Sequence, residues 1–535
     1  MKRFIALLMS LCITAGLCSL GFECVQASDD EIPFIFVVGY GTTLYRDNED
    51  GTRETIYGGE FDTGIVTEYI NEYKDVLIKA IITQNWSDFD DAVYTIMDDL
   101  YGDIKLNNQG YPDDGSYAYQ KNEWQVRADY SRNTKNPYDY NFYYDWRLDP
   151  YDIVPQLREY VELVQRVTGK KEYAIAGRCE GASILLAYMD AYKDPNLKKA
   201  IFYASASKGC TPITECLSGE LYVDAQAVER FLYDMKFDLD VDVLGMFTLT
   251  DELLRQIVQT LTDMYGLDVA CWAINNVYEQ ICGDILPRTM MNTFGSLPGF
   301  WSMVAPEKYK KAKTFMFAGK EDEYADFIKK IDTYHYIVAV RQEEIIMQAQ
   351  NRGTEVYDIV KYGKPHLPLT ADADALSDRM AKVEDASFGA TVKDVNTSFS
   401  QAELDKIEAA GNLSYVSPEK NIDASTGYLK DTTWYIDNIT HGDFEYHAAD
   451  ELIFSIVDNP GFDIHTDPEF PQYLYCDREK DVLLIPDQNS GSGMSTVEIW
   501  KETTDTTARK WKPFFKVFYK IFTFILKLFT LPART

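Results

Sequence analysis

Apolar runs and helical repeats alternate along the first part of the chain. Phe34–Val38 is a short apolar run that ends in the glycine turn Gly39-Tyr40-Gly41, and this pattern predicts a buried strand. After Asp149-Pro150, apolar residues recur at helical spacing up to Gly169, which predicts a helix. The chain also contains predicted strands at Tyr140–Trp146, Tyr173–Ala176 and Ala200–Ala204, and a predicted helix from about Gly181. This alternation implies an α/β fold with a mostly parallel sheet and right-handed crossovers.

The second part of the chain is predicted to begin with a mainly helical cap insertion at about residues 207–311. The sheet is then expected to resume with strands at Thr314–Ala318 and Glu355–Tyr362. The segment Ala371–Gly427 is polar and is expected to be rich in loops. No long flexible linker divides the sequence, so we expect one body over residues 28–500.

The first 27 residues are predicted to form a secretory signal peptide. Lys2 and Arg3 precede an apolar stretch, and small residues stand at Val25-Gln26-Ala27, where cleavage would occur. We therefore expect a secreted or otherwise extracytoplasmic protein. In an oxidising compartment, the close pairs Cys210/Cys216 and Cys271/Cys282 could form disulfides.

Residues 508–535 form a basic, aromatic tail. Between Trp511 and Leu531, four lysines (Lys512, Lys516, Lys520 and Lys527) interrupt an otherwise aromatic and aliphatic sequence at helical spacing. A helix of this kind is typical of the headgroup layer of a membrane, and we expect the tail to hold the protein at a membrane surface. A membrane-spanning helix, or a helix packed against the acidic body of the protein, remains an alternative.

The composition limits the classes of partner. The 535 residues are 46% hydrophobic and 26% charged, which is ordinary for a folded protein. Asp and Glu number 85 against 52 Lys and Arg, and a formal charge of -33 opposes binding to nucleic acids. No cysteine spacing resembles a zinc site, and the acidic cluster Asp47–Asp50 does not have the spacing of an EF-hand, so neither a metal nor a cofactor is predicted.

The segment Gly177-Arg178-Cys179-Glu180-Gly181 lies between a predicted strand and a predicted helix. In a nucleophile elbow, a sharp turn exposes the central side chain, and glycines flank it because other side chains would collide with backbone. Backbone N–H groups at the start of the helix lower the pKa of a thiol and can bind an oxyanion. Cys179 is therefore a candidate nucleophile. The alternatives are a buried structural cysteine and one half of a disulfide.

Several short motifs together resemble the α/β-hydrolase superfamily, and within it the group of lecithin:cholesterol acyltransferase and phospholipid:diacylglycerol acyltransferase. The motifs are Pro33–Leu44, Tyr144-Asp145-Trp146-Arg147, the segment Gly177–Gly181, Phe294–Pro298 and Tyr362-Gly363. The resemblance implies a central sheet with helices on both faces, and an oxyanion hole formed by backbone N–H groups of Tyr40 or Gly41 and of Glu180. The chain departs from the group's pattern at Cys179, where the group has serine, at Arg178, where it has histidine, and at Arg379, where it has glycine.

A thiol nucleophile for acyl transfer needs a histidine, which a carboxylate in turn orients. The family resemblance implies Asp378 as the acid and His441 as the base. A rival pair is Asp322 and His366, because each follows a predicted strand; Asp423 and Asp431 are further candidates for the acid. His335, His447 and His465 are expected to be solvent-exposed or helix-capping residues, and Trp146-Arg147 is expected to be a structural stack.

Two functions of different classes follow from these patterns. The first is an exported, membrane-associated acyl-ester hydrolase or acyltransferase that acts through a Cys-His-Asp triad on lipid-like acyl donors. The alternative is a catalytically inactive surface or binding protein, which kept the hydrolase fold and is attached to the membrane by its C-terminal helix.

Overall fold

The computed structural model describes residues 32–58, 85–118, 140–235, 285–443 and 447–486, together with scattered residues of 69–83 and 271–283. The predicted signal peptide and the basic tail therefore lie outside the described residues. So does Cys282, and with it the proposed pair Cys271/Cys282.

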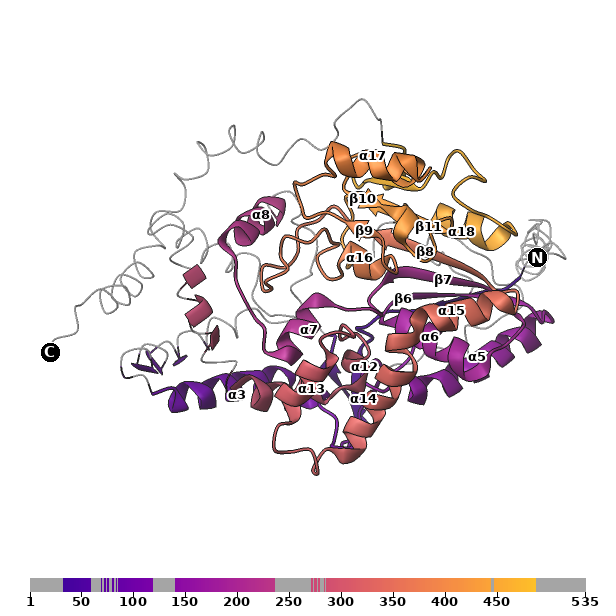
Figure 1. The fold of residues 1–535 in the computed structure, drawn as a ribbon. Coiled ribbons are helices and arrows are strands. Elements are labelled where there is room, and N and C mark those ends of the chain that lie inside the picture. Colours follow the sequence, from indigo (N-terminus) through magenta and orange to yellow (C-terminus); the bar gives the residue numbers. More distant parts are fainter. Residues whose placement is uncertain are drawn as a thin grey trace, which may run out of the picture.

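An eight-stranded, mostly parallel sheet forms the centre of the protein (Figure 1). Its strand order is β13-β12-β11-β8-β7-β6-β1-β5. The strands are β1 (Phe34–Val37), β5 (Tyr140–Phe142), β6 (Tyr173–Cys179), β7 (Leu197–Ser205), β8 (Glu355–Lys361), β11 (Thr433–Asp437), β12 (Tyr473–Asp477) and β13 (Val482–Leu484). Neighbouring strands from β5 to β12 are parallel, whereas β13 pairs antiparallel with β12. The predicted α/β class is confirmed.

Helices cover both faces of the sheet, as Figure 1 shows. Alternate residues of β1 point to opposite faces, because side chains alternate along a strand. Ile35 and Val37 join a core with α5 (Pro150–Thr168), α6 (Glu180–Tyr192) and α15 (Gln342–Asn351). On the other face, Phe34 and Phe36 belong to a second core that includes α18 (Asp450–Asp458). The sheet is thus buried on both sides, which explains the continuous apolar runs of its central strands.

Sequence signals placed α5 accurately. The Asp149 side chain accepts a hydrogen bond from the N–H of Tyr151 at 2.8 Å, so it caps the first turn. Gly169 ends the helix in the left-handed conformation, with φ of 72°. The buried residues Ile153, Leu157, Val161 and Val164 confirm the predicted apolar face.

The described regular elements between β7 and β8 are helices. They are α7 (Thr211–Ser218), α8 (Ala225–Met235), α11 (Ile285–Met291), α12 (Pro298–Trp301), α13 (Tyr309–Phe317), α14 (Ala325–Ile337) and α15, with short 3-10 turns at Phe294–Ser296 and Ala339–Arg341. The strand predicted at Thr314–Ala318 is wrong, because α13 occupies this segment. Tyr309, Ala312 and Met316 are buried at helical spacing, and that periodicity begins before the short apolar run on which the prediction relied.

The segment between β8 and β11 contains little regular structure. It has the two-stranded pair of β9 (Thr391–Val392) and β10 (Ile422–Asp423), and the helices α16 (Val383–Ala386) and α17 (Gln401–Ala409). This agrees with the loop-rich character predicted for Ala371–Gly427. Among the described helices, none is long and apolar enough to cross a membrane.

The pair Cys210/Cys216 does not form the disulfide that the sequence allowed. Cys210 is a buried free thiol at the N-cap of α7. Cys216 lies six positions further along the chain, and residues at that separation do not share a helix face.

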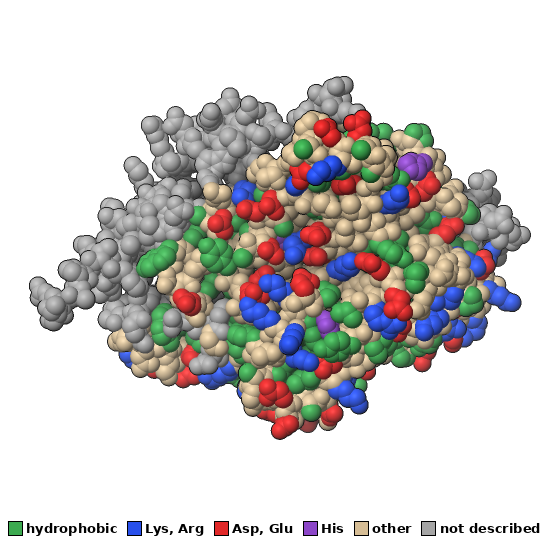
Figure 2. All heavy atoms as spheres, viewed as in Figure 1, with side chains coloured by type: hydrophobic (Ala, Val, Ile, Leu, Met, Phe, Trp, Pro, Cys, Tyr) green, Lys and Arg blue, Asp and Glu red, His purple; other side chains and the backbone are tan. Residues whose placement is uncertain are grey.

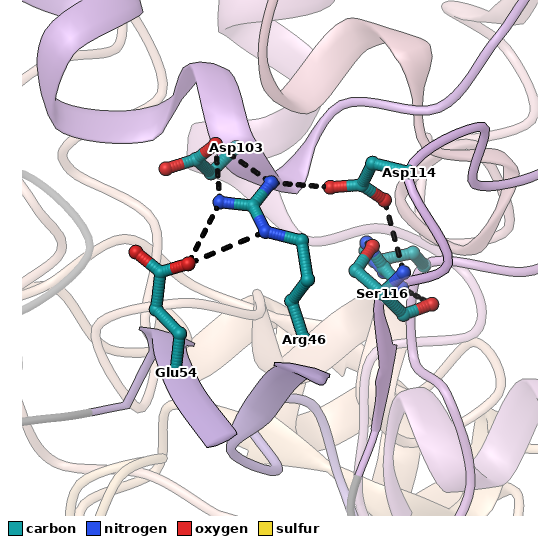
Figure 3. A network of polar contacts seen from close by, with 6 residues as sticks. Arg46, Glu54, Asp103, Asp114 and Ser116 are labelled. Atoms are coloured by element: carbon teal, nitrogen blue, oxygen red, sulfur yellow. Dashed lines mark hydrogen bonds and ion pairs between the residues drawn. The ribbon is translucent and has the colours of Figure 1, made fainter. Parts of the chain in front are cut away.

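A small three-stranded sheet follows β1 in the chain. It consists of β2 (Leu44–Asp47), β3 (Arg53–Tyr57) and β4 (Tyr117–Ala118), in the order β3-β2-β4. Figure 3 shows Arg46 of β2 among the carboxylates of Glu54, Asp103 and Asp114, which it contacts at 3.1, 3.4 and 2.8 Å. This network ties the small sheet to the 3-10 turn Gly102–Ile104, which directly follows α3 (Ser87–Tyr101), and to the loop that contains Asp114. Elsewhere on the face seen in Figure 2, acidic and basic side chains are interspersed.

The segment after β5 is fixed by a buried ion pair. Arg147 donates from Nε and Nη2 to the two carboxylate oxygens of Asp145, at 2.9 and 2.7 Å, and its side chain is 0% exposed. It also donates to the Ser116 hydroxyl at 2.9 Å. The indole of Trp146 is buried and lies near the ring of Tyr40, with centroids 4.6 Å apart. This confirms the structural role predicted for Trp146-Arg147.

Candidate active site

Cys179 occupies a strained turn at the end of the central strand β6. Its backbone has φ of 55° and ψ of -120°, an unusual combination for a residue other than glycine. A Cβ on Gly177 would lie 2.4 Å from the carbonyl oxygen of Gly181, and one on Gly181 would lie 2.6 Å from the carbonyl oxygen of Val37. Both flanking glycines are therefore required by close backbone approach, as a nucleophile elbow demands.

We expect Gly181→Ala to destabilise the protein by about 1–3 kcal/mol, because the added methyl group must displace backbone of β1. Gly102→Ala is a suitable control. Gly102 also has helical dihedral angles, but the nearest atoms that a Cβ there would meet belong to the side chain of Asp98 and not to backbone. Urea denaturation midpoints at unchanged slope would measure both changes. Equal midpoints for the two variants would contradict the crowding seen at Gly181.

The structure brings Cys179, His441 and Asp378 together. The thiol of Cys179 and the imidazole of His441 are close enough that each shifts the pKa of the other. Nδ1 of His441 is 2.7 Å from Oδ2 of Asp378, so Nε2 is the nitrogen left for the thiol. The backbone N–H of His441 also donates to the carbonyl oxygen of Asp378 at 2.8 Å. Asp378 follows β8 and His441 follows β11, so the carboxyl ends of three parallel strands deliver the three side chains to one edge of the sheet.

The charges of these three groups support one another. Burial alone raises the pKa of the Cys179 thiol, but His441, Arg178 and the N–H of Glu180 more than offset it, and the pKa falls below its ordinary value. Burial opposes the imidazolium of His441, yet Asp378 and Cys179 raise the pKa of His441 above its ordinary value. Asp378 keeps a lowered pKa in spite of burial, because His441 and the N–H groups of Met380 and Ala381 stabilise its carboxylate. The arrangement favours a thiolate-imidazolium pair.

Backbone N–H groups lie where an oxyanion could bind. The N–H of Glu180, at the start of α6, is close enough to the sulfur of Cys179 to lower the pKa of the thiol. Tyr40 and Gly41 form the turn after β1, and within the described residues their N–H groups have no backbone acceptor. A Cβ on Gly39 of the same turn would lie 3.0 Å from the Cβ of Cys179, which places the turn beside the nucleophile.

Hydrogen bonds hold this turn against the segment after β5. The hydroxyl of Tyr144 donates to the carbonyl oxygen of Val38 at 3.0 Å. The hydroxyl of Thr42 donates to the carbonyl oxygen of Tyr144 at 3.1 Å, and the indole N–H of Trp146 donates to that of Thr42 at 2.8 Å. The candidate oxyanion turn is thus anchored by a segment that the buried Asp145–Arg147 pair fixes.

The rival pair is not brought together. Asp322 is exposed on the turn between α13 and α14, whereas His366 is buried and bonds from Nε2 to the hydroxyl of Thr211 at 2.9 Å. Burial lowers the pKa of His366 to about 4. The other candidate acids are engaged elsewhere: Asp423 accepts from Ser425, and Asp431 accepts from the hydroxyl of Tyr415.

The remaining histidines lie outside the site. His335 is buried and stacks on Tyr309 with ring centroids 3.8 Å apart, so it is not solvent-exposed; it lies in the last turn of α14, and its helix-capping role stays a prediction. His447 contacts Asp450 at the start of α18, and His465 is exposed, in agreement with their predicted roles.

Asp443 is a site residue that sequence reasoning missed. Its Oδ2 accepts from the N–H of Thr440 at 2.7 Å, and its carbonyl oxygen accepts from the buried ammonium of Lys361 at 3.2 Å. These bonds close the turn that carries His441. The spacing Thr440-His441-Gly442-Asp443 was a usable signal, because an aspartate three positions after a threonine can bond back to its N–H group.

Two other features carry no chemistry for this site. A groove of about 670 Å³ lies between α13 and α14, but none of the residues that line it belongs to the triad. Within the part of the chain that the structure describes, no group of three or more His, Cys, Asp or Glu side chains is arranged to hold a metal ion.

No family model matches the chain, and no curated protein matches it either. The family resemblance carried by the sequence motifs therefore stays a prediction, and the case for a function rests on the geometry of the site.

Proposed function

We propose that this protein is an acyl-transfer enzyme of the α/β-hydrolase type, with Cys179 as nucleophile, His441 as acid-base and Asp378 as the residue that orients His441. One observation carries the proposal. The strained turn after the central strand presents a thiol beside a histidine, each of which shifts the pKa of the other, and a buried carboxylate bonds Nδ1 of that histidine. This is the arrangement that nucleophilic acyl transfer requires.

In the first step, the Cys179 thiolate attacks the carbonyl carbon of an ester or thioester. The N–H groups of Glu180 and of Tyr40 or Gly41 stabilise the oxyanion of the tetrahedral intermediate. His441, protonated at Nε2, donates that proton to the leaving alcohol or thiol as the bond to the carbonyl carbon breaks. The acyl group is then held on the sulfur as a thioester.

In the second step, neutral His441 takes a proton from the acceptor, which attacks the thioester and regenerates the thiolate. Water as acceptor gives hydrolysis, and another alcohol gives acyl transfer. The basic, aromatic sequence of residues 511–531 favours a lipid-like acyl donor taken at a membrane surface, outside the cytoplasm.

Acylation of Cys179 is the direct test. We expect a chromogenic short-chain thioester or ester to leave its acyl group on the peptide that contains Cys179, detected by mass spectrometry after rapid acid quench. Cys210 is a matched internal control, since it is a free thiol whose burial raises its pKa well above the ordinary value. It should stay unmodified.

Cys179→Ala should abolish both the acylated peptide and the release of chromophore. A wild-type protein that neither acylates at Cys179 nor reacts faster than Cys210 with iodoacetamide would contradict the proposal. That result would favour the inactive binding protein instead.

A further inference from the structure

Tyr144 contacts both halves of the proposed oxyanion site. Its hydroxyl oxygen lies 3.0 Å from the carbonyl oxygen of Val38, which precedes the turn with Tyr40 and Gly41. The same oxygen lies 3.3 Å from Oε2 of Glu180, whose N–H faces the sulfur of Cys179. The side chains of Tyr144 and Glu180 are both 0% exposed.

A phenol has only one hydrogen, so it can make one full hydrogen bond of these two. The carbonyl oxygen of Val38 can only accept and is the nearer of the two oxygens, so we assign the Tyr144 hydrogen to it. The second contact then joins two oxygens, and its hydrogen must come from Glu180. We infer that Glu180 is a protonated carboxylic acid at neutral pH, which donates to Tyr144 and so acts as a positioning residue that joins the two halves of the oxyanion site.

The surroundings of Glu180 favour the neutral acid. The titratable groups that face it are Cys179 from the elbow, Tyr144 and Asp145 from the segment after β5, Tyr40 from the oxyanion turn and Tyr334 from α14. None of these is a cation. Burial raises the pKa of Glu180 well above its ordinary value, and Cys179 and Asp145 act in the same direction, whereas the contact with Tyr144 acts against them without reversing the shift. Oε1 has no hydrogen-bond partner within the described residues, which suits an uncharged group.

A neutral Glu180 matters for the chemistry directly beside it. A negative charge at this position would raise the pKa of the adjacent thiol and repel the developing oxyanion. The neutral acid does neither, and its bond to Tyr144 links the start of α6 to the turn after β1. This inference on Glu180 extends the proposed function, on which the role of the oxyanion site rests.

The protonation state is tested by the pH dependence of Cys179 alkylation in the full-length chain. Iodoacetamide labelling of the Cys179 peptide is followed by mass spectrometry for the wild type and for Glu180→Gln. Glutamine has the same shape and can donate the same hydrogen bond, and it is uncharged. We expect the midpoint of the pH profile to stay unchanged. A midpoint lower by about one pH unit or more would show that a charge had been removed, and would overturn the inference.

The positioning role is tested by Tyr144→Phe, with Tyr160→Phe as the matched control. Tyr160 is a buried tyrosine of α5 whose hydroxyl also donates to a backbone carbonyl, that of Asn141, at 3.0 Å. We expect Tyr144→Phe to lower kcat about tenfold to a hundredfold with little change in KM, because oxyanion contacts are made in the transition state. Tyr160→Phe should leave kcat unchanged. Equal kcat values for the two variants would overturn the role.

The alkylation measurement needs no turnover. A protein that transfers no acyl group would refute the proposed function, while the comparison of wild type with Glu180→Gln would still decide whether Glu180 is protonated.

Discussion

We expect Asp378→Asn to lower kcat/KM for acyl transfer about 10⁴-fold, which is the scale observed when the orienting carboxylate of a catalytic triad is replaced. Asp378 fixes the hydrogen of His441 on Nδ1, through the contact of 2.7 Å. An asparagine amide can present its N–H₂ to that nitrogen, which stabilises the tautomer in which Nε2 carries the only hydrogen. His441 could then no longer accept a proton from Cys179 or from the acceptor.

The same substitution should shift the alkylation profile of Cys179 to higher pH. Asp378 raises the pKa of His441, and the imidazolium in turn lowers the pKa of the thiol. Removing the carboxylate charge lowers the pKa of His441, so less imidazolium is present to stabilise the thiolate. Wild-type Cys179 should react half-maximally below the ordinary thiol pKa of about 8.5, and the Asp378→Asn variant at a higher pH than the wild type.

Asp322→Asn is the matched control, since Asp322 is an exposed aspartate of the rival pair. It should change neither kcat/KM nor the alkylation midpoint. A loss of activity on Asp322→Asn with normal activity in Asp378→Asn would show that the triad seen here is not the working one.

The second large effect is expected at Asp145, away from the reacting atoms. Asp145→Ala should lower the free energy of unfolding by about 3–5 kcal/mol, because it leaves the guanidinium of Arg147 buried without its counter-charge. Arg147 would retain only its bonds to Ser116, at 2.9 Å to the hydroxyl and 3.2 Å to the carbonyl oxygen. Denaturant unfolding followed by fluorescence would measure the loss.

Glu54→Ala provides the comparison at an exposed ion pair. Glu54 contacts Arg46 with side chains 47% and 26% exposed, and Arg46 keeps two further carboxylates, as Figure 3 shows. We expect a loss of about 0–1 kcal/mol there. The double change Asp145→Leu with Arg147→Met should recover much of the stability lost in Asp145→Ala, since apolar side chains can replace a buried pair. Similar losses in Asp145→Ala and Glu54→Ala would contradict the burial argument.

Local sequence signals were sufficient to predict the turn at Cys179 and the half of the sheet around it. The cap at Asp149, the end at Gly169 and the glycines that flank Cys179 each have a backbone reason that acts within a few residues, so the sequence predicts them well. The strand predicted at Thr314–Ala318, where α13 lies, was wrong for the opposite reason. A five-residue apolar run fits a strand or a buried helix equally, and only the burial of Tyr309 and Ala312 decides between them.

Contacts between distant segments could not be predicted from spacing. The choice of Asp378 and His441 over Asp322 and His366 came from a family resemblance, because the chain order permits both pairs. No sequence pattern around His335 indicates that the ring of Tyr309 stacks on it. The neutral state inferred for Glu180 depends on its contact with Tyr144, which lies in the segment after β5. No sequence pattern predicts this contact between distant residues.

The order of the strands also determines when the thiol becomes reactive during synthesis. Cys179 leaves the ribosome with β6, but Asp378 follows only after β8 and the helices before it, and His441 follows only after β11. Until β11 has docked, the sulfur does not have the imidazole of His441 beside it and remains an ordinary, mostly protonated thiol. A nascent chain should therefore react slowly at this cysteine, and its reactivity toward an alkylating probe can serve as a marker of complete folding.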